Sequence, residues 1–498
     1  MGVSDFAFGV SHGRGIPRIK EVGVRLAAVR VGVLAAVGAL GLGWQSVPQR
    51  RFSPEEVAKI AAHWRADGRY TVRAPAEASK AGPWQVRLSV EGSTWLWNYN
   101  RARGVGKGPP TLDPEPKNPD EESWEKWIDA KVARDRWLAA KAAATLNAAV
   151  LGKESSRDAA RDPEPPDPGP IPQSLLALAG NPPPFAAPIV PLVHEVRFEG
   201  KTVVRYTDNP PMRARYAYYR FSQGVMHVGK KVRDTPAEEL DSLFKEAGVT
   251  PSERKVMAAV SMLEGGFESV NTYDTGFVSV GFIQFACLKD GAGSLGQVLL
   301  RHKKRSASQF EADFRRFGLD VTDQGALVAL DPSTGAELVG AEAAGKIIDD
   351  KRLIAVFQRA GEFSRSFRVA QVLVAKEQYY PASDEVRVDL GNGKALTGKV
   401  SEFVRSEAGM ATLMDRKVNT GKLDFLPEVL SYCAERAGAK SLKDLAKYER
   451  DIAALMKFRT DYLADTSLSQ PGPSLLAKRD YEELASRRAS RNARRPPE

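Results

Sequence analysis

Prolines are concentrated in one stretch of the chain, residues 161–191, and this stretch restricts how the rest can be organised. It contains the run from Pro163 to Pro172 and the triplet from Pro182 to Pro184. Proline removes backbone donors and favours extended polyproline conformations. We therefore predict a semi-rigid linker at 161–191. The 498 residues then divide into a first module at 51–160 and a larger domain at 192–470.

The first 50 residues combine positive charge with an apolar run. Arginines from Arg14 to Arg30 precede the apolar residues 31–44. That run is short for a membrane-spanning helix and suits the hydrophobic part of a signal peptide. We predict an export signal in residues 1–50, with an uncleaved membrane anchor at 31–44 as the alternative. The expected location is the bacterial periplasm or cell envelope, or outside the cell.

A formal net charge of +10 favours anionic partners, such as nucleic acid, an acidic membrane surface or an acidic wall polymer. Many of the arginines lie in the tails, and residues 471–498 have little apolar periodicity, so we expect a basic, disordered tail there. No motif that reads nucleic acid is recognisable, so specific nucleic-acid binding is not expected. The content of 43% hydrophobic and 27% charged residues is typical of a soluble globular protein.

The cysteines and histidines do not form the patterns of a metal site. The two cysteines, Cys287 and Cys433, are far apart in the sequence. The five histidines show neither H-x-x-x-H nor H-E-x-x-H spacing. We predict a fold held by packing alone, with no metal and no cofactor.

The first module has the pattern of a small α+β unit that is rich in tryptophan. Ser53, Pro54 and Glu56 predict a capped helix start, residues 70–73 and 84–90 alternate like strands, and a long helix is expected over 123–147. Trp95, Trp97 and Tyr99 alternate, so on a strand they would share one face. They would then either stack on sugar rings or, in the interpretation that we favour, pack in a core.

The larger domain is expected to be mainly helical. A hairpin is predicted at 194–206, with its break at Glu199 and Gly200, and another at 386–394. Thr235 and Thr250 each precede a proline and, three residues on, a glutamate, which predicts two capped helices. Further helices are expected at 293–303, 307–316, 341–359, 363–380, 401–415 and 441–464.

Glu264 is the candidate for acid chemistry. The helix after Thr250 is expected to bury Val256, Met257, Val260 and Leu263, with Glu264 at its end, before Gly265 and Gly266. A helix C-terminus and apolar neighbours both disfavour ionisation, so they would raise the pKa of this carboxyl group. A general acid in glycoside cleavage needs such a pKa, and the two glycines would let a glycan approach. The alternative is a solvated last-turn glutamate before a glycine cap.

A segment too apolar for an ordinary loop follows, and it contains Ser279, Gly281 and Gln284. A helix with a glutamate, then a tight segment, then Ser-x-Gly-Phe-Ile-Gln, resembles the lysozyme superfamily, especially lytic transglycosylases and goose-type lysozymes. The resemblance covers about residues 250–300. It implies a mainly α-helical, lysozyme-like domain with small β-hairpins, in an α+β chain. It also implies that Glu264 is the acid and that the substrate-binding residues are Tyr273, Ser279, Gly281 and Gln284.

The stretch from Asp274 to Phe285 is also similar to the chitosanase branch, and this likeness implies that Asp274 is a second carboxylate that activates water. The chain departs from both patterns. Transglycosylases usually have serine where Gly265 stands, and chitosanases separate their two carboxylates by more than the ten positions found here. Tyr379 and the adjacent Tyr380 are candidates for the tyrosine that transglycosylases place later in the chain.

These observations predict an enzyme, a glycoside hydrolase or lytic transglycosylase, that cleaves a β-1,4-linked aminosugar polymer, most readily peptidoglycan. The alternatives are a chitosanase-like hydrolase and a non-catalytic glycan-binding or envelope scaffold protein. Two competing acids, Glu268 and Asp290, are expected to be surface residues. Ion-pair or capping roles are expected for Glu407, Asp415 and Asn419.

Overall fold

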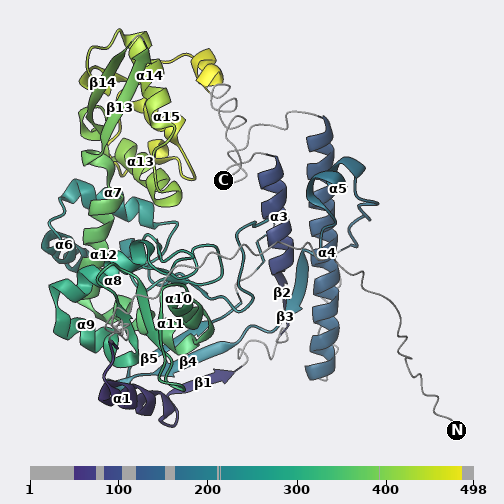
Figure 1. Cartoon of the computed structure of the whole chain (residues 1–498). Helices are drawn as coiled ribbons and strands as arrows, with labels where there is room; N and C mark the ends of the chain where they lie inside the picture. The colour runs from purple at the N-terminus through teal and green to yellow at the C-terminus, as the bar shows by residue number, and fades with distance from the viewer. Residues whose placement is uncertain are drawn as a thin grey trace, which may run out of the picture. The chain divides into compact units, whose positions relative to one another are not determined.

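The computed structural model describes residues 50–73, 84–103, 119–151, 163–209, 212–213, 215–391 and 393–484. Residues 31–44, for which an export signal or anchor is predicted, lie outside these ranges. Within them, no helix is both long and apolar enough to cross a membrane. The chain belongs to the mixed α+β class, with many helices and several small antiparallel sheets (Figure 1).

Helix α1 (Pro54–Arg65) begins as predicted. The Ser53 hydroxyl accepts a hydrogen bond from the Glu56 N–H at 3.2 Å, and the Glu56 side chain accepts one from the Ser53 N–H at 2.6 Å. Strands β1 (Tyr70–Arg73) and β2 (Gln85–Leu88) follow, and the long helix is α4 (Pro119–Leu151). Both strands and the long helix are therefore confirmed.

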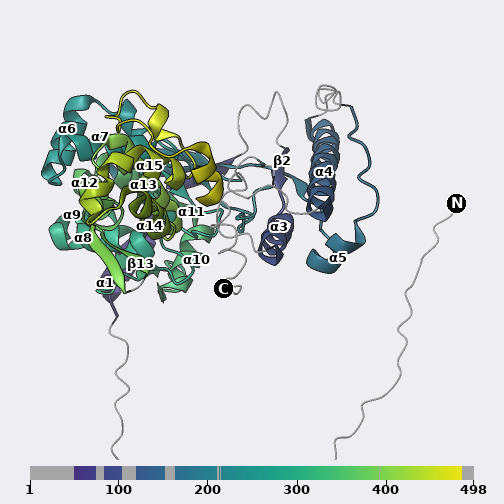
Figure 2. The same cartoon turned by 90° about the horizontal axis from the view of Figure 1, so that it is seen from above.

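The segment that contains Trp95 and Tyr99 is a helix, α3 (Val90–Ala102), so these side chains do not share a strand face, as the sugar-stacking alternative would require. Ser89 caps this helix by accepting from the Gly92 N–H at 3.0 Å. One helical turn brings the rings of Trp95 and Tyr99 into a stack with centroids 5.7 Å apart, and both rings are buried. Helix α3 and strand β2 lie beside α4 in Figure 2. The core interpretation of Trp95 and Tyr99 therefore holds.

The proline-rich stretch takes part in packing instead of separating two units. It contains helix α5 (Gln173–Ala179) and strand β3 (Ala186–Ile189), which pairs with β2. Strand β1 pairs with β4 (Val193–Arg197), and Phe52 and Trp64 lie in the same core cluster as the helices of the larger domain. Arg50–Glu498 accordingly forms one compact unit, in contrast to the predicted linker.

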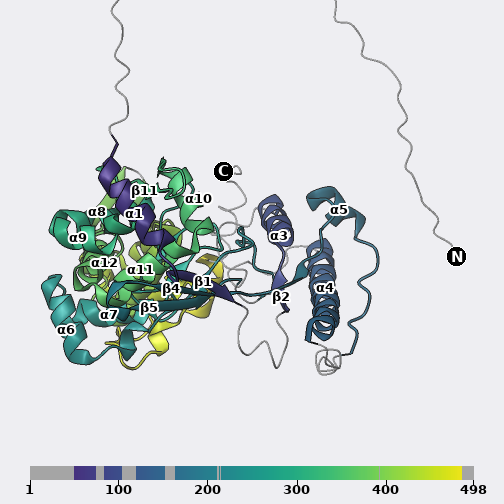
Figure 3. The same cartoon turned by 90° about the horizontal axis from the view of Figure 1, so that it is seen from below.

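The predicted hairpin after residue 193 is confirmed. Strand β4 pairs with β5 (Val203–Thr207), and the break contains Gly200 with a positive φ of 71°. Together with β1 they form a three-stranded antiparallel sheet in the order β1-β4-β5 (Figure 3). One face of this sheet buries Val196, Val204 and Tyr206.

Most helices of the larger domain lie where the sequence predicts them, and Thr250 caps α7 with the full reciprocal pair of hydrogen bonds. The one helix predicted at 341–359 is wrong, because Asp350 is extended there and divides it into two. The Thr235 box is wrong, because Pro236 precedes α6 in an extended conformation and no side chain caps that helix. Helix α14 was not predicted. The helices of this part are α6 (Ala237–Glu246), α7 (Pro251–Ser261), α8 (Gly293–Arg305), α9 (Ala307–Asp313), α10 (Ala341–Asp349), α11 (Lys351–Phe363), α12 (Arg365–Gln378), α13 (Glu407–Thr420), α14 (Leu426–Ala437) and α15 (Glu449–Met456).

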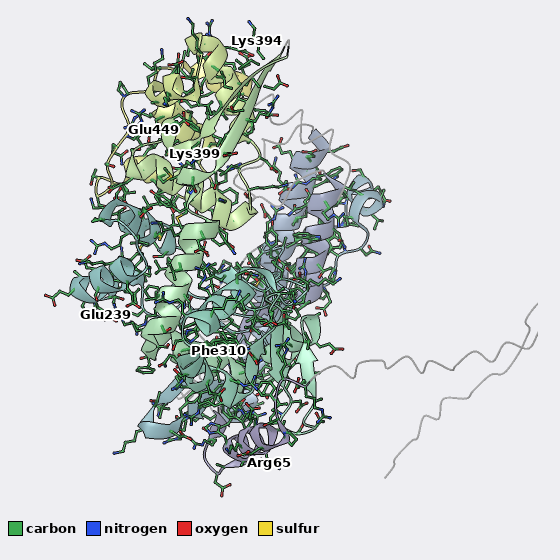
Figure 4. The ribbon with its side chains drawn as sticks, turned by 60° about the vertical axis from the view of Figure 1, so that its left-hand side comes forward. Arg65, Glu239, Phe310, Lys394, Lys399 and Glu449 are labelled. Carbon is green, nitrogen blue, oxygen red and sulfur yellow. The ribbon has the colours of Figure 1, made fainter. Side chains whose placement is uncertain are left out.

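Three further sheets, all antiparallel, complete this part of the chain. The predicted hairpin near residue 390 is formed by the last two strands, and Figure 4 marks Lys394 and Lys399 at the ends of β14. The strands are β6 (Met226–His227), β7 (Val270–Asn271), β8 (Ser279–Val280), β9 (Phe285–Ala286), β10 (Leu319–Val321), β11 (Leu327–Leu330), β12 (Glu337–Val339), β13 (Glu385–Gly391) and β14 (Lys394–Lys399).

The first half of the predicted disordered tail is ordered. Asp480 is buried. It accepts a hydrogen bond from the Tyr432 hydroxyl at 2.8 Å and forms an ion pair with Arg436, and both partners lie on α14. Leu484 is also buried. Residues 471–484 therefore pack against the fold. The sequence pattern did not predict α14, the helix that contains their partners Tyr432 and Arg436.

Candidate active site

Glu264 lies one turn beyond the end of α7 and not in its last turn. The helix ends at Ser261, whose carbonyl oxygen accepts from the N–H groups of both Glu264 and Gly265 at 3.0 Å. The turn directs Leu263 outward, with 53% of its side chain exposed, so its predicted burial is wrong. The Glu264 side chain is only 11% exposed, whereas Val256, Met257 and Val260 are buried as predicted.

The two glycines after Glu264 make room for the protein's own backbone. The Gly266 N–H donates to the Val228 carbonyl at 2.8 Å. A Cβ atom on Gly266 would lie 2.0 Å from the Lys230 carbonyl oxygen, and one on Gly265, whose φ is +131°, would lie 2.6 Å from that of Val228. The glycines thus accommodate residues 228–230, which differs from the glycan approach expected from the sequence.

Two side chains distant in sequence complete the surroundings of the Glu264 carboxyl group. The Arg459 guanidinium forms an ion pair with Glu264 and donates a 3.0 Å hydrogen bond to Asp415 Oδ1. Asn419 donates to the same Asp415 oxygen at 3.1 Å. Arg459 therefore bridges two carboxylates, one after α7 and one on α13.

Burial raises the pKa of Glu264 above its ordinary value, and the Arg459 charge and hydrogen bond oppose this shift. The negative charges of Asp415 and Asp274 add to the upward shift. The outcome is a carboxyl group that holds its proton more tightly than an exposed glutamate does.

Asp274, the candidate second carboxylate, is held by three donors. Its oxygens accept from the Gly276 N–H at 2.9 Å, from Asn271 Nδ2 at 3.0 Å and from the Tyr216 hydroxyl at 3.2 Å. Burial raises the pKa of Asp274, and these hydrogen bonds together with the charge of Arg213 lower it, with a net upward shift. Asp274 and Glu264 thus belong to one electrostatic environment.

The segment around Ser279 and Gln284 forms the hairpin that follows Glu264. Ser279 is buried on β8 opposite Asn271. Gly281 has a φ of +88°, and a Cβ there would lie 2.2 Å from Gln371 Oε1. Gln284 donates to Ser269 Oγ at 2.6 Å, and its Oε1 has no hydrogen-bond partner in the described part of the chain. Ser279 and Gly281 thus shape the hairpin, and Gln284 holds it to the turn that follows Glu264.

The two candidate tyrosines lie in different surroundings. Tyr273 precedes Asp274, is buried, and packs against Tyr216 and Tyr219 with ring centroids 5.8 and 6.1 Å away. Tyr379 ends α12, where its ring lies 6.2 Å from that of Phe285 and Ser294 is its hydrogen-bond partner. The contacts described for Tyr379 thus join it to the hairpin and to α8, and Tyr273 alone is adjacent to a candidate carboxylate.

The remaining acids have structural partners. Glu268 accepts from the Lys230 N–H at 2.5 Å, and the exposed Asp290 accepts from the Ala292 N–H at 3.4 Å. Glu407 lies 3.5 Å from Lys255, and Asp415 is paired with Arg459. The expected ion-pair roles of Glu407 and Asp415 are confirmed. Arg459 itself was missed, because no local sequence pattern marks the partner of a residue 195 positions away.

No protein-family model matches this chain, and no match is found among curated proteins or among solved structures.

Proposed function

We propose that the protein cleaves glycosidic bonds in a β-1,4-linked aminosugar polymer, with peptidoglycan as the substrate, and that Glu264 is the general acid. The observation that supports this most is the state of Glu264, a nearly buried carboxyl group whose pKa is raised by burial and, in part, by the charge of Asp274. The place of Glu264 between α7 and the hairpin β7–β8–β9 agrees with the resemblance to the lysozyme superfamily. The export signal predicted in residues 1–50 and the positive net charge suit an anionic wall.

In the proposed mechanism, Glu264 protonates the glycosidic oxygen as the bond to the anomeric carbon breaks. Burial raises the pKa of the carboxyl group, which favours the protonated form that a general acid needs before the transfer. Arg459 then stabilises the carboxylate that the transfer leaves behind. Arg459 thus stabilises the ionised form of Glu264, which is present after the transfer, more than the protonated form, which is present before it.

Asp274 would accept a proton from the attacking water, and this two-carboxylate reaction inverts the anomeric configuration. It needs a water molecule between carboxyl groups that stand about 6.5–9.5 Å apart. The three hydrogen bonds that Asp274 accepts oppose the upward pKa shift that burial causes, and they favour the ionised form that a base requires. This feature favours the second candidate function, a chitosanase-like hydrolase. Without Asp274, Glu264 would return as base, and the sugar's own hydroxyl or acetamido group would complete the reaction.

The test is incubation of the protein with peptidoglycan and with chitosan, with products identified by mass. The whole chain is needed because Phe52 and Trp64 belong to the core of the larger domain. Glu264→Gln is expected to lower turnover by at least about 100-fold, the scale of general acid catalysis. Glu268→Gln, the matched control on a neighbouring acid, should leave turnover unchanged.

Unchanged turnover in the Glu264→Gln variant would contradict the proposal. Anhydro ends would identify a lytic transglycosylase, and reducing ends a hydrolase. Binding of glycan without any cleavage by the unmodified protein would instead support an envelope scaffold, the remaining alternative.

A further inference from the structure

Aromatic and cationic side chains gather beside Asp274, and we call this group the Asp274 ledge. Tyr216 donates to Asp274 and its ring lies 5.7 Å from that of Tyr218, which lies 5.2 Å from that of Trp97. Two guanidinium groups cover these rings. The members of the ledge are Trp97, Arg213, Tyr216, Tyr218 and Arg220.

Hydrogen bonds fix the ledge to the candidate active site. The Arg220 N–H donates to the Tyr273 carbonyl at 2.8 Å, and Tyr219 forms an isolated bridge with Asp274. Ser93 of α3 donates to the Tyr216 carbonyl at 2.6 Å. Because Trp97 is one helical turn after Ser93, it lies on the same face of α3. The tryptophan-rich segment therefore extends the surroundings of Asp274.

Neither arginine of the ledge forms a salt bridge in the part of the chain that the structure describes, although the charge of Asp274 acts on both. Arg213 is exposed and contacts the Met226 sulfur at 3.2 Å and the rings of Tyr216 and Tyr273 at 5.5 and 5.9 Å. Arg220 contacts the Tyr219 carbonyl and lies 5.4 Å over the ring of Trp97.

The nearby acids have a different partner. Arg215 pairs with Glu125 and, at 3.2 Å, with Asp129. In the described part of the chain, the single carboxylate of Asp274 therefore faces two positive charges, those of Arg213 and Arg220. An acidic ligand would be attracted to them, and a cationic one repelled.

We propose that the Asp274 ledge binds the carboxylate-bearing unit of an acidic aminosugar polymer, and this proposal rests on the proposed function. The edges of the half-buried rings offer apolar area to a sugar ring, and a guanidinium matches a carboxylate with two parallel hydrogen bonds. Peptidoglycan carries carboxylates on its lactyl-peptide stems, whereas chitosan carries amines. The ledge thereby selects peptidoglycan over chitosan.

The experiment measures binding of peptidoglycan sacculi and of chitosan by the Glu264→Gln protein, which cannot turn the polymer over if the proposed function holds. Arg213→Gln is the informative variant, because the side chain is exposed and its loss should not disturb folding. We expect about a tenfold weaker binding to sacculi, the scale of one charge-assisted hydrogen bond. Arg220→Gln should act in the same direction, and chitosan binding should stay equal or increase.

Arg205→Gln is the matched control. Arg205 is exposed on β5 and paired with Glu195, so the change removes the same charge from another surface. An equal loss of sacculus binding in this control, or no loss in Arg213→Gln, would overturn the proposal. So would single-stranded DNA binding that depends on Arg213 while sacculus binding does not.

Failure of the ledge and failure of the proposed function give different results. If the ledge alone is wrong, Arg213→Gln in the otherwise unmodified protein cleaves peptidoglycan with an unchanged KM. If the catalytic proposal alone is wrong, no cleavage occurs and Arg213→Gln still weakens sacculus binding.

Discussion

The carboxyl group of Glu264 is subject to two opposing influences, burial, which favours its neutral form, and Arg459, which favours its charged form. The sequence pattern predicts an upward shift in the pKa of Glu264, and the shift has that direction. Part of the shift was expected from a helix terminus, whereas burial is the largest cause and Asp415 and Asp274 contribute. The apolar neighbours in the sequence predict desolvation, whereas the contributions of Arg459, Asp415 and Asp274 depend on tertiary packing.

Replacement of Arg459 by glutamine should raise the pKa of Glu264 further, because the cation that opposes burial is lost. A general acid works in its protonated form, so the alkaline limb of the kcat/KM profile should move to higher pH. Turnover should fall at the same time, because the carboxylate left after proton transfer loses its partner. The pH dependence of peptidoglycan cleavage measures both effects.

The control for this change is Lys457→Gln, which removes a charge two residues away whose partner is Asp461 at 3.1 Å. An alkaline limb that stays in place in Arg459→Gln, or moves equally in Lys457→Gln, would contradict the assigned role of Arg459.

Gly266 is required by the protein's own backbone and not, as the sequence suggested, by an approaching glycan. Its backbone lies against the Lys230 carbonyl, so Gly266→Ala should destabilise the fold by about 1–3 kcal/mol, the cost of forcing atoms into a packed site. Urea denaturation measures the change.

The comparison is Gly345→Ala on α10, where a Cβ meets nothing within 4 Å. A helical alanine there should add roughly 0.5–1 kcal/mol of stability. Equal stability of the two variants would show that residues 228–230 yield to the added methyl group.

At the scale of elements, signals confined to a few residues predicted the structure well. The capping boxes at Ser53 and Thr250 depend on neighbours within three positions, and both are formed. The run from Trp95 to Tyr99 did not reveal its period, because alternation and helical spacing both fit so short a segment. The packing of Trp95 against Phe185, with centroids 5.7 Å apart, belongs to the helical arrangement.

Thr235 and Thr250 provide a matched pair for an element-scale prediction, because both precede proline and both have glutamate three residues on. Thr250 accepts from the Glu253 N–H at 3.3 Å, whereas α6 has no side-chain cap. Thr250→Ala should therefore cost about 1 kcal/mol of stability, and Thr235→Ala should change it little. Thermal unfolding distinguishes them, and equal losses would show that the cap geometry at Thr250 does not decide the stability of α7.

At the scale of the whole molecule, the sequence predicted the fold class and most elements but not how they join. The proline-rich stretch suggested two separate units, yet β2 pairs with β3 inside the stretch and β1 pairs with β4 beyond it. Proline restricts the backbone only locally, so it does not predict which strands the flanking segments pair with. The candidate site shows the same limit, because Glu264 and Asp274 come from one predicted segment while Asp415 and Arg459 come from later ones.

Helix α1 is joined to a distant part of the chain. The N–H groups of Arg51 and Phe52 donate to the Glu337 carboxylate at 2.9 and 2.7 Å, and Trp64 Nε1 donates to the Phe317 carbonyl at 3.0 Å. A ribosome releases residues 51–64 long before residues 317–337. Helix α1 and the two residues before Ser53 must therefore wait for Phe317 and Glu337 while more than half of the protein is synthesised.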